Sequence, residues 1–218
     1  KVGEKIIFDE KAGISGKISA RNEITFNARG GIEAVYKLGV MPLPPYIKRA
    51  PQELDNEYYQ TVYAKNEGAI ASPTAGLHFT RELMERMKST GINFAHITLH
   101  VGAGTFRPLK VDDVTRHKME AEYFKIPQEA IGLIEKTREA GARIFAVGTT
   151  SLRALESYCL RRGSQGYTDL FIYPGYKFKM VDCLLTNFHL PRTTLFMLAC
   201  AFAGGRLIKK AYQEAIAR

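Results

Sequence analysis

Residues 127–157, PQEAIGLIEKTREAGARIFAVGTTSLRALES, place a helix-like run, a glycine, a short apolar run and a second helix-like run in immediate succession. Pro127 suits the first position of a helix, and Gly141 suits its C-terminal stop. The run RIFAVG at 143–148 is typical of a buried strand. We therefore expect a helix, then a strand, then a new helix beginning near Ser151.

The same order occurs earlier in the chain, at residues 80–101. TRELMERMKSTG has Thr80 as a candidate N-cap and Gly91 as a stop, and INFAHITLHV at 92–101 reads as a strand. Repeated alternation of helix and strand favours a largely parallel α/β core. Later segments predict a strand at 169–173 and two helices at 192–204 and 206–218, the first of them buried.

The N-terminal part has a different sequence pattern, without the alternation of helix and strand. Short segments at 5–8, 13–19 and 22–26 are separated by glycine, asparagine and charged residues, which is typical of small antiparallel strands. The prolines in MPLPPYIKR, residues 41–49, favour an extended connector. We expect residues 1–41 to be the remnant of a small β-domain and residues 42–218 to form an α/β domain.

Composition narrows the function classes. The chain carries 31 basic and 22 acidic residues, a net charge of +9, which suits a polyanionic partner, although many basic proteins bind no nucleic acid. The three cysteines are widely spaced, which argues against a disulfide framework or a structural zinc and favours a reducing cytoplasm. No apolar run reaches the roughly 18 residues of a membrane helix, so we expect no membrane association.

Polar residues occur at several positions where an expected strand ends and a helix is expected to begin. His78, His100 and His189 all stand at such positions, and so do Asn187 and the turn 149–151. Ligands of parallel α/β folds bind at the carboxyl ends of strands, so these residues are candidates for one pocket. Each histidine is also explicable as a satisfied core residue, and Thr150 or Ser151 as a helix cap.

Other site types are poorly supported. VGAGTF at 101–106 lacks the third glycine of a dinucleotide-binding fingerprint, yet Gly102 and Gly104 permit close backbone approach, with Thr105 and Arg107 as donors. Ser151 lacks the Gly-x-Ser-x-Gly elbow of a hydrolase. The histidines lie on separate elements, so we expect no metal.

Longer motifs carry a resemblance. The segments MPLPPYIKR, DNEYYQTVYA, ASPTAGLHFT, LHVGAGTFRPLKVDDVTRHKMEAEYF, AVGTTSLRALES, FIYPGYKFKMVDCLLTNFHLPRTTLFMLACAFAG and AYQEAIAR resemble the S-adenosylmethionine:tRNA ribosyltransferase-isomerase family of queuosine biosynthesis. They occur in the family's order and cover most of the chain from Pro42 onward. The resemblance implies a barrel-like α/β catalytic domain with an inserted small antiparallel β-barrel. It also implies a fragment, because the family's N-terminal part and its aromatic C-terminal tail have no counterpart here.

The resemblance implies an activity and two substrates. Such an enzyme transfers and isomerises the ribosyl group of S-adenosylmethionine onto 7-aminomethyl-7-deazaguanine in a tRNA anticodon, giving epoxyqueuosine-tRNA, adenine and methionine. S-adenosylmethionine is consumed, so no cofactor is expected, and family similarity favours a monomer.

Residue roles follow from that chemistry as expectations. His78 or His100 is the general base that takes a proton beside the sulfonium, and His189 is the general acid for adenine. Arg107 and Arg153 would hold the methionine carboxylate or a tRNA phosphate. The expected substrate-binding residues are Thr74, Gly76, Gly102, Gly104, Thr105, Arg107, Thr149, Thr150, Ser151, Arg153 and Asn187.

Two rival functions stay open on the sequence. A base-exchanging tRNA glycosylase needs a carboxylate nucleophile, for which Glu156 and Asp182 are the candidates. A non-catalytic RNA-binding module would need only the basic surface.

Overall fold

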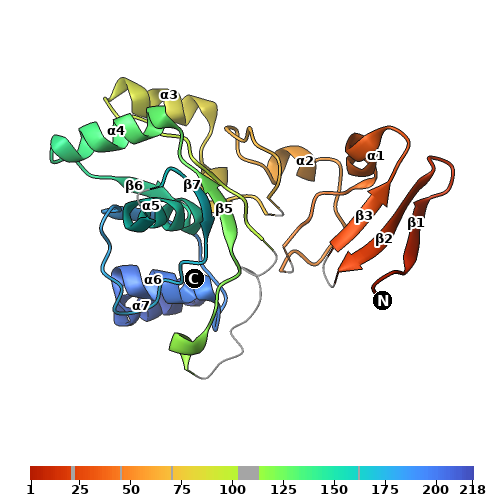
Figure 1. The fold of residues 1–218 in the computed structure, drawn as a ribbon. Helices are drawn as coiled ribbons and strands as arrows, with labels where there is room; N and C mark the ends of the chain where they lie inside the picture. The colour runs from red at the N-terminus through yellow and green to blue at the C-terminus, as the bar shows by residue number, and fades with distance from the viewer. Residues whose placement is uncertain (21–22, 45, 70, 103–112, 162) are drawn as a thin grey trace. The chain divides into compact units, whose positions relative to one another are not determined.

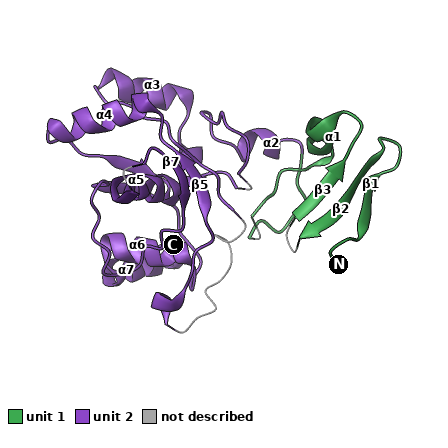
Figure 2. Cartoon of the chain, in the orientation of Figure 1, with its two compact units in different colours: residues 1–52 green, residues 53–218 purple. Residues whose placement is uncertain are grey.

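The computed structural model describes residues 1–20, 23–44, 46–69, 71–102, 113–161 and 163–218. The chain forms two compact units, Lys1–Gln52 and Glu53–Arg218, which Figure 2 shows in different colours. The sequence placed the boundary between residues 41 and 42, whereas the first unit also includes the proline-rich stretch that follows.

The first unit is a small antiparallel sheet with one helix. Strands β1 (Lys5–Asp9), β2 (Ile14–Ala20) and β3 (Glu23–Asn27) pair in that order, and α1 (Gly31–Leu38) follows. The prediction of small antiparallel strands is confirmed. The three strands form an open sheet, and no closed barrel is present among the described residues of this unit.

The second unit alternates helices with short strands. Its elements are α2 (Asp55–Tyr58), the 3₁₀ helix η1 (Thr74–His78), α3 (Arg81–Ser89), β4 (Thr98–Leu99), the 3₁₀ helix η3 (Val114–Arg116), β5 (Glu122–Lys125), α4 (Gln128–Glu139), β6 (Phe145–Val147), α5 (Thr149–Arg161), β7 (Gln165–Thr168), β8 (Cys183–Leu185), α6 (Thr194–Ala203) and α7 (Gly205–Ala217). Figure 1 traces them along the chain.

The helices follow the sequence signals closely. Thr80 caps α3, its side chain accepting a hydrogen bond from Leu83 N at 3.1 Å. Pro127 directly precedes α4, and Gly141 directly follows the cap of that helix in a left-handed conformation. Helix α5 begins at Thr149, two positions before the expected start. The mixed α/β class is thus confirmed for the second unit.

The strand pairing corrects the prediction of a largely parallel core. Strands β4, β5 and β7 form an antiparallel sheet, and the parallel pairing found among the described residues joins β6 with β8. The expected strand at 92–101 shrinks to Thr98–Leu99, and the one at 169–173 is absent; β7 lies just before it. Alternation locates helices and strands, but pairing depends on long-range packing that the pattern does not contain.

Helix α5 lies at the centre of the core. Leu152, Ala154 and Leu155 are almost fully buried and belong to one cluster with Phe124 of β5 and Leu198 of α6. Figure 1 shows α6 and α7 packed side by side next to this layer. Because Leu152, Ala154 and Leu155 follow directly on the first residues of α5, the core holds the start of this helix in place. The start of α5 is part of the candidate site.

Candidate active site

Two of the predicted polar turns meet at the end of the parallel strand pair. Val147 of β6 lies opposite Leu185 of β8, and the N–H of Gly148 donates to the Leu185 carbonyl at 2.9 Å. Gly148 has a left-handed φ of 89°, which lets α5 begin directly after the strand. The turn at 148–151 and the segment beginning at Thr186 therefore lie at the same edge.

Asn187 connects this edge to the 3₁₀ helix η1. The Thr74 hydroxyl donates to Asn187 Oδ1 at 3.1 Å, and Asn187 Nδ2 lies 3.4 Å from His78 Nε2. An amide nitrogen can only donate, so in a hydrogen bond between these two atoms Nε2 is the acceptor. His78 is exposed. Thr74, His78 and Asn187, predicted as site residues, are thus brought together as a Thr74–Asn187–His78 network.

His189 lies deeper at the same edge. Its Nε2 is 2.9 Å from the Thr186 hydroxyl, and its backbone N–H donates to the Tyr212 hydroxyl at 2.6 Å. Burial lowers the pKa of His189 from 6.5 to about 4. The ring is therefore neutral at pH 7, which counts against His189 as the proton donor to adenine; that role stays a prediction.

The chain segment 61–68 runs beside β4 and borders two of the predicted residues. Asn66 Nδ2 donates to Thr98 Oγ1 at 2.7 Å, and a Cβ on Gly68 would meet the His100 ring at 3.0 Å. A Cβ on Gly76 would lie 2.0 Å from the Tyr63 hydroxyl. Gly76 and Gly68 are therefore glycines because other side chains occupy the space beside them.

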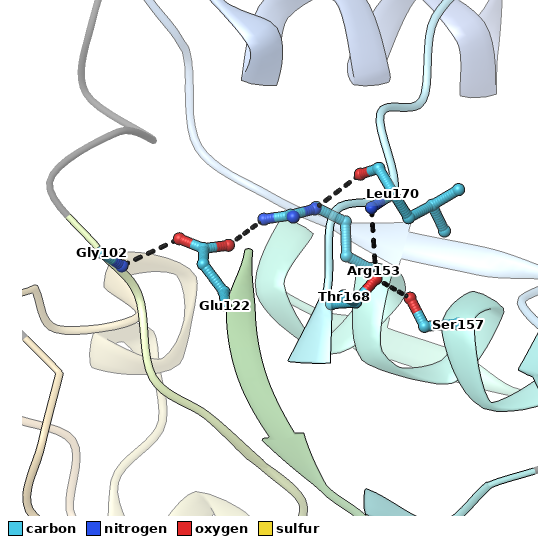
Figure 3. Close-up of polar contacts among 6 residues, drawn as sticks. All are labelled: Gly102, Glu122, Arg153, Ser157, Thr168 and Leu170. Atoms are coloured by element: carbon cyan, nitrogen blue, oxygen red, sulfur yellow. Dashed lines mark hydrogen bonds and ion pairs between the residues drawn. The ribbon is translucent and has the colours of Figure 1, made fainter. Parts of the chain in front are cut away.

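Arg153 is held inside the protein rather than displayed to solvent. Its Nη1 forms a buried ion pair with Glu122 Oε2, and its Nε donates to the Leu170 carbonyl at 3.1 Å (Figure 3). The other oxygen of Glu122 accepts from Gly102 N at 2.8 Å. Nη2 of Arg153 is buried without a hydrogen-bond partner among the described residues. The predicted contact with a substrate anion has only this one donor left to make it.

The first turn of α5 supplies backbone donors beside Asn187. The leading N–H groups of a helix have no partner within it and carry partial positive charge. Thr149 is buried, while Thr150 and Ser151 are half-buried. The arrangement suits a ligand with a carboxylate or several hydroxyl groups. Gly104, Thr105 and Arg107, the remaining predicted residues, lie outside the described residues.

The described residues hold neither a metal cluster nor a membrane-spanning helix. Groups of three or more histidine, cysteine, aspartate or glutamate side chains that would suit a metal ion do not occur in the described parts of the chain. Cys159, Cys183 and Cys200 are all free thiols. None of the helices in the described ranges combines the length and apolar character that crossing a membrane requires.

Sequence comparison decides the family. The model of a family described as queuosine biosynthesis protein matches residues 1–218. The chain belongs to this queuosine biosynthesis family. The family resemblance inferred from the motifs is confirmed.

Curated relatives in the family are longer than this chain. A protein of Sulfurihydrogenibium sp. (strain YO3AOP1) is 57% identical over 83% of this chain and 54% of its own length. One from Polynucleobacter asymbioticus is 57% identical over 83% of this chain and 52% of its own. Both are named S-adenosylmethionine:tRNA ribosyltransferase-isomerase. The chain spans about half the length of these relatives.

A solved structure of the family shares the fold. The crystal structure of S-adenosylmethionine tRNA ribosyltransferase from Thermotoga maritima is 46% identical, with a TM-score of 0.54, and the match covers 66% of this chain and 46% of that one. The likeness supports the mixed α/β architecture.

In this queuosine biosynthesis protein, both carboxylates considered as glycosylase nucleophiles hold backbone in place. Glu156 is 0% exposed and accepts hydrogen bonds from the N–H groups of Lys179, Met180 and Val181. Asp182 Oδ2 accepts from Ile144 N at 2.7 Å. Neither carboxylate is directed at the Thr74–Asn187–His78 network by a described contact, so the structural explanation of both is the stronger one.

Sequence reasoning missed three residues that shape the site. Glu122 pairs with Arg153, Tyr63 occupies the space beside Gly76, and Tyr212 anchors the backbone of His189. Each is far in sequence from the residue it touches. In EYFK at 122–125, Glu122 occupies the same face of the strand as Phe124, and a glutamate in register with an apolar residue is the one local signal that could have marked it as a buried partner.

Proposed function

We propose that this protein is an S-adenosylmethionine:tRNA ribosyltransferase-isomerase of queuosine biosynthesis. The observation that carries the proposal is the 57% identity with curated proteins of that name over 83% of the chain. In the complete enzyme we expect a barrel-like catalytic domain with a small β-barrel inserted into it. S-adenosylmethionine and tRNA bearing 7-aminomethyl-7-deazaguanine are the substrates.

The chemistry needs a base, ordered placement and departure of two leaving groups. The sulfonium acidifies the adjacent C5′ protons, and a general base removes one of them. The C4′–O4′ bond of the ribose then breaks, and adenine leaves from C1′ carrying a proton. The aminomethyl nitrogen of the tRNA base bonds to C4′ and loses a proton, C5′ bonds to C1′, and the oxygen on C1′ displaces methionine from C5′ to close the epoxide. The protein contributes proton transfer and alignment of the reacting atoms. S-adenosylmethionine is consumed and no cofactor is needed.

His78 is the better supported of the two candidates for the base. Its Nε2 lies 3.4 Å from Asn187 Nδ2 and its side chain is exposed, so a substrate proton can reach this nitrogen. Thr74 fixes the Asn187 amide from the other side at 3.1 Å. His100, by contrast, stacks on Tyr123 with ring centroids 5.8 Å apart. We assign proton removal to His78 and orientation to Thr74 and Asn187.

The start of α5 is the proposed binding point for the rest of S-adenosylmethionine. Its backbone N–H groups at 149–151 suit the methionine carboxylate or the ribose hydroxyls. His189, neutral at pH 7, serves here as a hydrogen-bonding residue held by Thr186 and Tyr212.

A cytoplasmic location and a monomeric state complete the proposal. Three free thiols in the described part of the chain fit a reducing compartment. Light scattering of the purified protein checks the mass, and a dimer at working concentration would contradict the monomer.

The test follows both small products. The full-length protein is incubated with S-adenosylmethionine and tRNA carrying the 7-aminomethyl-7-deazaguanine base, and adenine and methionine are separated by chromatography. Release of both only when the modified tRNA is present supports the proposal. Base exchange without free adenine points to a glycosylase, and tight RNA binding without any product points to a non-catalytic RNA-binding module.

A further inference from the structure

Three aromatic rings stand in a row across the antiparallel sheet of the second unit. The His100 ring, just after β4, stacks on Tyr123 of β5 with centroids 5.8 Å apart and planes at 17°. Tyr123 lies directly opposite Tyr167 of β7, with centroids 5.7 Å apart and planes at 68°, an edge-to-face contact that leaves the face of Tyr167 uncovered by Tyr123. The backbone N–H of His100 donates to the Tyr123 carbonyl at 2.9 Å, which continues the pairing up to the histidine. The row is thus built by the sheet itself.

This aromatic row of His100, Tyr123 and Tyr167 lies on the face directed away from the core. Side chains alternate between the two faces of a strand, and Phe124, next to Tyr123, is 1% exposed in the core. On β7, Thr168 is 0% exposed whereas Tyr167 is 64% exposed. The core side of the sheet is occupied by its contacts with α5, and the ring side is open at Tyr167.

Basic and polar side chains accompany the rings. Lys125, two residues beyond Tyr123 on the same face, is paired by register with Thr98 and Gln165. Arg161 donates to the Tyr167 carbonyl at 2.6 Å and forms an ion pair with Asp169 at 2.5 Å, so its charge is already paired. The chain as a whole carries a net charge of +9. An aromatic row with the exposed Lys125 beside it matches a polyanion that also offers flat apolar groups.

Unpaired RNA bases are the ligand with that chemistry. Sheets that bury one face and display aromatic rings on the other bind single-stranded RNA by stacking, while bases within a duplex are already stacked and covered. The two ends of the row differ in exposure. Gly68 lies close to His100, and a Cβ added to Gly68 would come within 3.0 Å of the His100 ring, whereas Tyr167 at the other end is 64% exposed. A strand of RNA would therefore enter at Tyr167.

We propose that the aromatic row is a stacking platform for unpaired bases of an RNA loop. The identity of that loop as the tRNA anticodon loop rests on the proposed function. Stacking holds the bases next to the reacting one and leaves the chemistry to the Thr74–Asn187–His78 network.

Tyr167→Ala is the decisive variant, since this ring is exposed and its removal leaves the core intact. Affinity is measured with an anticodon stem-loop RNA and with a blunt-ended RNA duplex of the same number of nucleotides, in which every base is paired. We expect Tyr167→Ala to weaken stem-loop binding about tenfold and Tyr167→Phe to retain it. Tyr58→Ala is the matched control, because Tyr58 is 69% exposed in the same unit but belongs to α2 and to none of the strands that carry the row. Equal weakening for the duplex would overturn the proposal.

Salt dependence separates stacking from charge. Lys125→Ala removes an ammonium group that can bind a phosphate, so it should lower the slope of log affinity against log salt concentration, whereas Tyr167→Ala should leave that slope unchanged. A slope that falls as much in Tyr167→Ala as in Lys125→Ala would show that the ring acts through phosphate binding, against the proposal.

A spectroscopic probe can be introduced cleanly because the chain contains no tryptophan. Tyr167→Trp places a single indole at the open end of the row, and stacking by a base should quench its fluorescence on addition of the stem-loop. Wild-type affinity without any change in emission would contradict stacking at this position.

Failure of this inference is distinguishable from failure of the proposed function. Product release with wild-type stem-loop affinity in Tyr167→Ala removes the platform and keeps the enzyme. Loss of stem-loop affinity in Tyr167→Ala without product release by the wild-type protein keeps the platform and removes the enzymatic activity.

Discussion

Glu122 and Arg153 form an ion pair whose two side chains are only 2% and 3% exposed. The pair ties the first residue of β5 to the second turn of α5, and Glu122 also accepts a hydrogen bond from Gly102 N. Burial of both charges makes each one dependent on the other. The pair therefore affects the candidate site indirectly, because it holds β5 and α5 together.

Glu122→Ala should lower the free energy of unfolding by about 3–5 kcal/mol, because it leaves the Arg153 charge buried without its partner. Urea denaturation followed by circular dichroism measures the change. Glu85→Ala is the matched control, since Glu85 pairs with Lys88 at 2.7 Å on the exposed surface of α3. A similar, small effect of both substitutions would show that the buried pair is not structural.

Gly76→Ala should destabilise the protein because the new Cβ would lie 2.0 Å from the Tyr63 hydroxyl. Combining it with Tyr63→Phe should recover part of the stability, since the nearest tyrosine atom that then remains is the ring carbon at 2.9 Å. Thermal unfolding of both single variants and the double variant gives the coupling.

Gly132→Ala provides the contrast for that experiment. Gly132 lies within α4 with nothing within 4 Å of the added carbon, so alanine should stabilise the helix by about 1 kcal/mol. Additive effects of the Gly76 and Tyr63 substitutions would mean that the two residues do not compete for the same space.

His189 should make stability fall on acidification. Its pKa is about 4 in the folded protein against 6.5 as the reference value, so between these values the unfolded chain binds a proton that the folded one does not. Stability is then full above pH 6.5 and is lost as the pH falls toward 4, by up to about 3 kcal/mol. His189→Gln should flatten this part of the curve of unfolding free energy against pH, and an unchanged curve would refute the buried neutral ring.

The sequence was sufficient for features that depend on neighbouring residues. The cap of α3 at Thr80 and the glycine stop after α4 follow from local chemistry, and so does the strand-to-helix turn at Gly148. The sequence did not predict which strands pair with each other. Nothing in EYFK or QGYT indicates that Tyr123 of β5 lies opposite Tyr167 of β7.

For the candidate site too, the sequence indicated individual residues, while the contacts between them required the fold. His78 and Asn187 were recognised from their positions after expected elements, but 109 residues separate them, and only the fold shows that they touch. Arg153 was read as exposed to a ligand because the helix start is visible in sequence, whereas Glu122, 31 residues earlier, is not visible as its partner. Long-range electrostatic partners require the three-dimensional arrangement.

His78→Ala should lower turnover about 10²- to 10⁴-fold if His78 removes the C5′ proton, because general base catalysis typically contributes that much. The fold should be unaffected, since the side chain is exposed. Asn187→Ala should have a smaller effect on turnover, because it removes only the group that orients the ring. His96→Ala, at another exposed histidine whose ring contacts Tyr63, is the control and should turn over at the wild-type rate. Adenine release under saturating S-adenosylmethionine and modified tRNA measures all three. Wild-type turnover in His78→Ala would remove His78 from the mechanism and return His100 to the role of base.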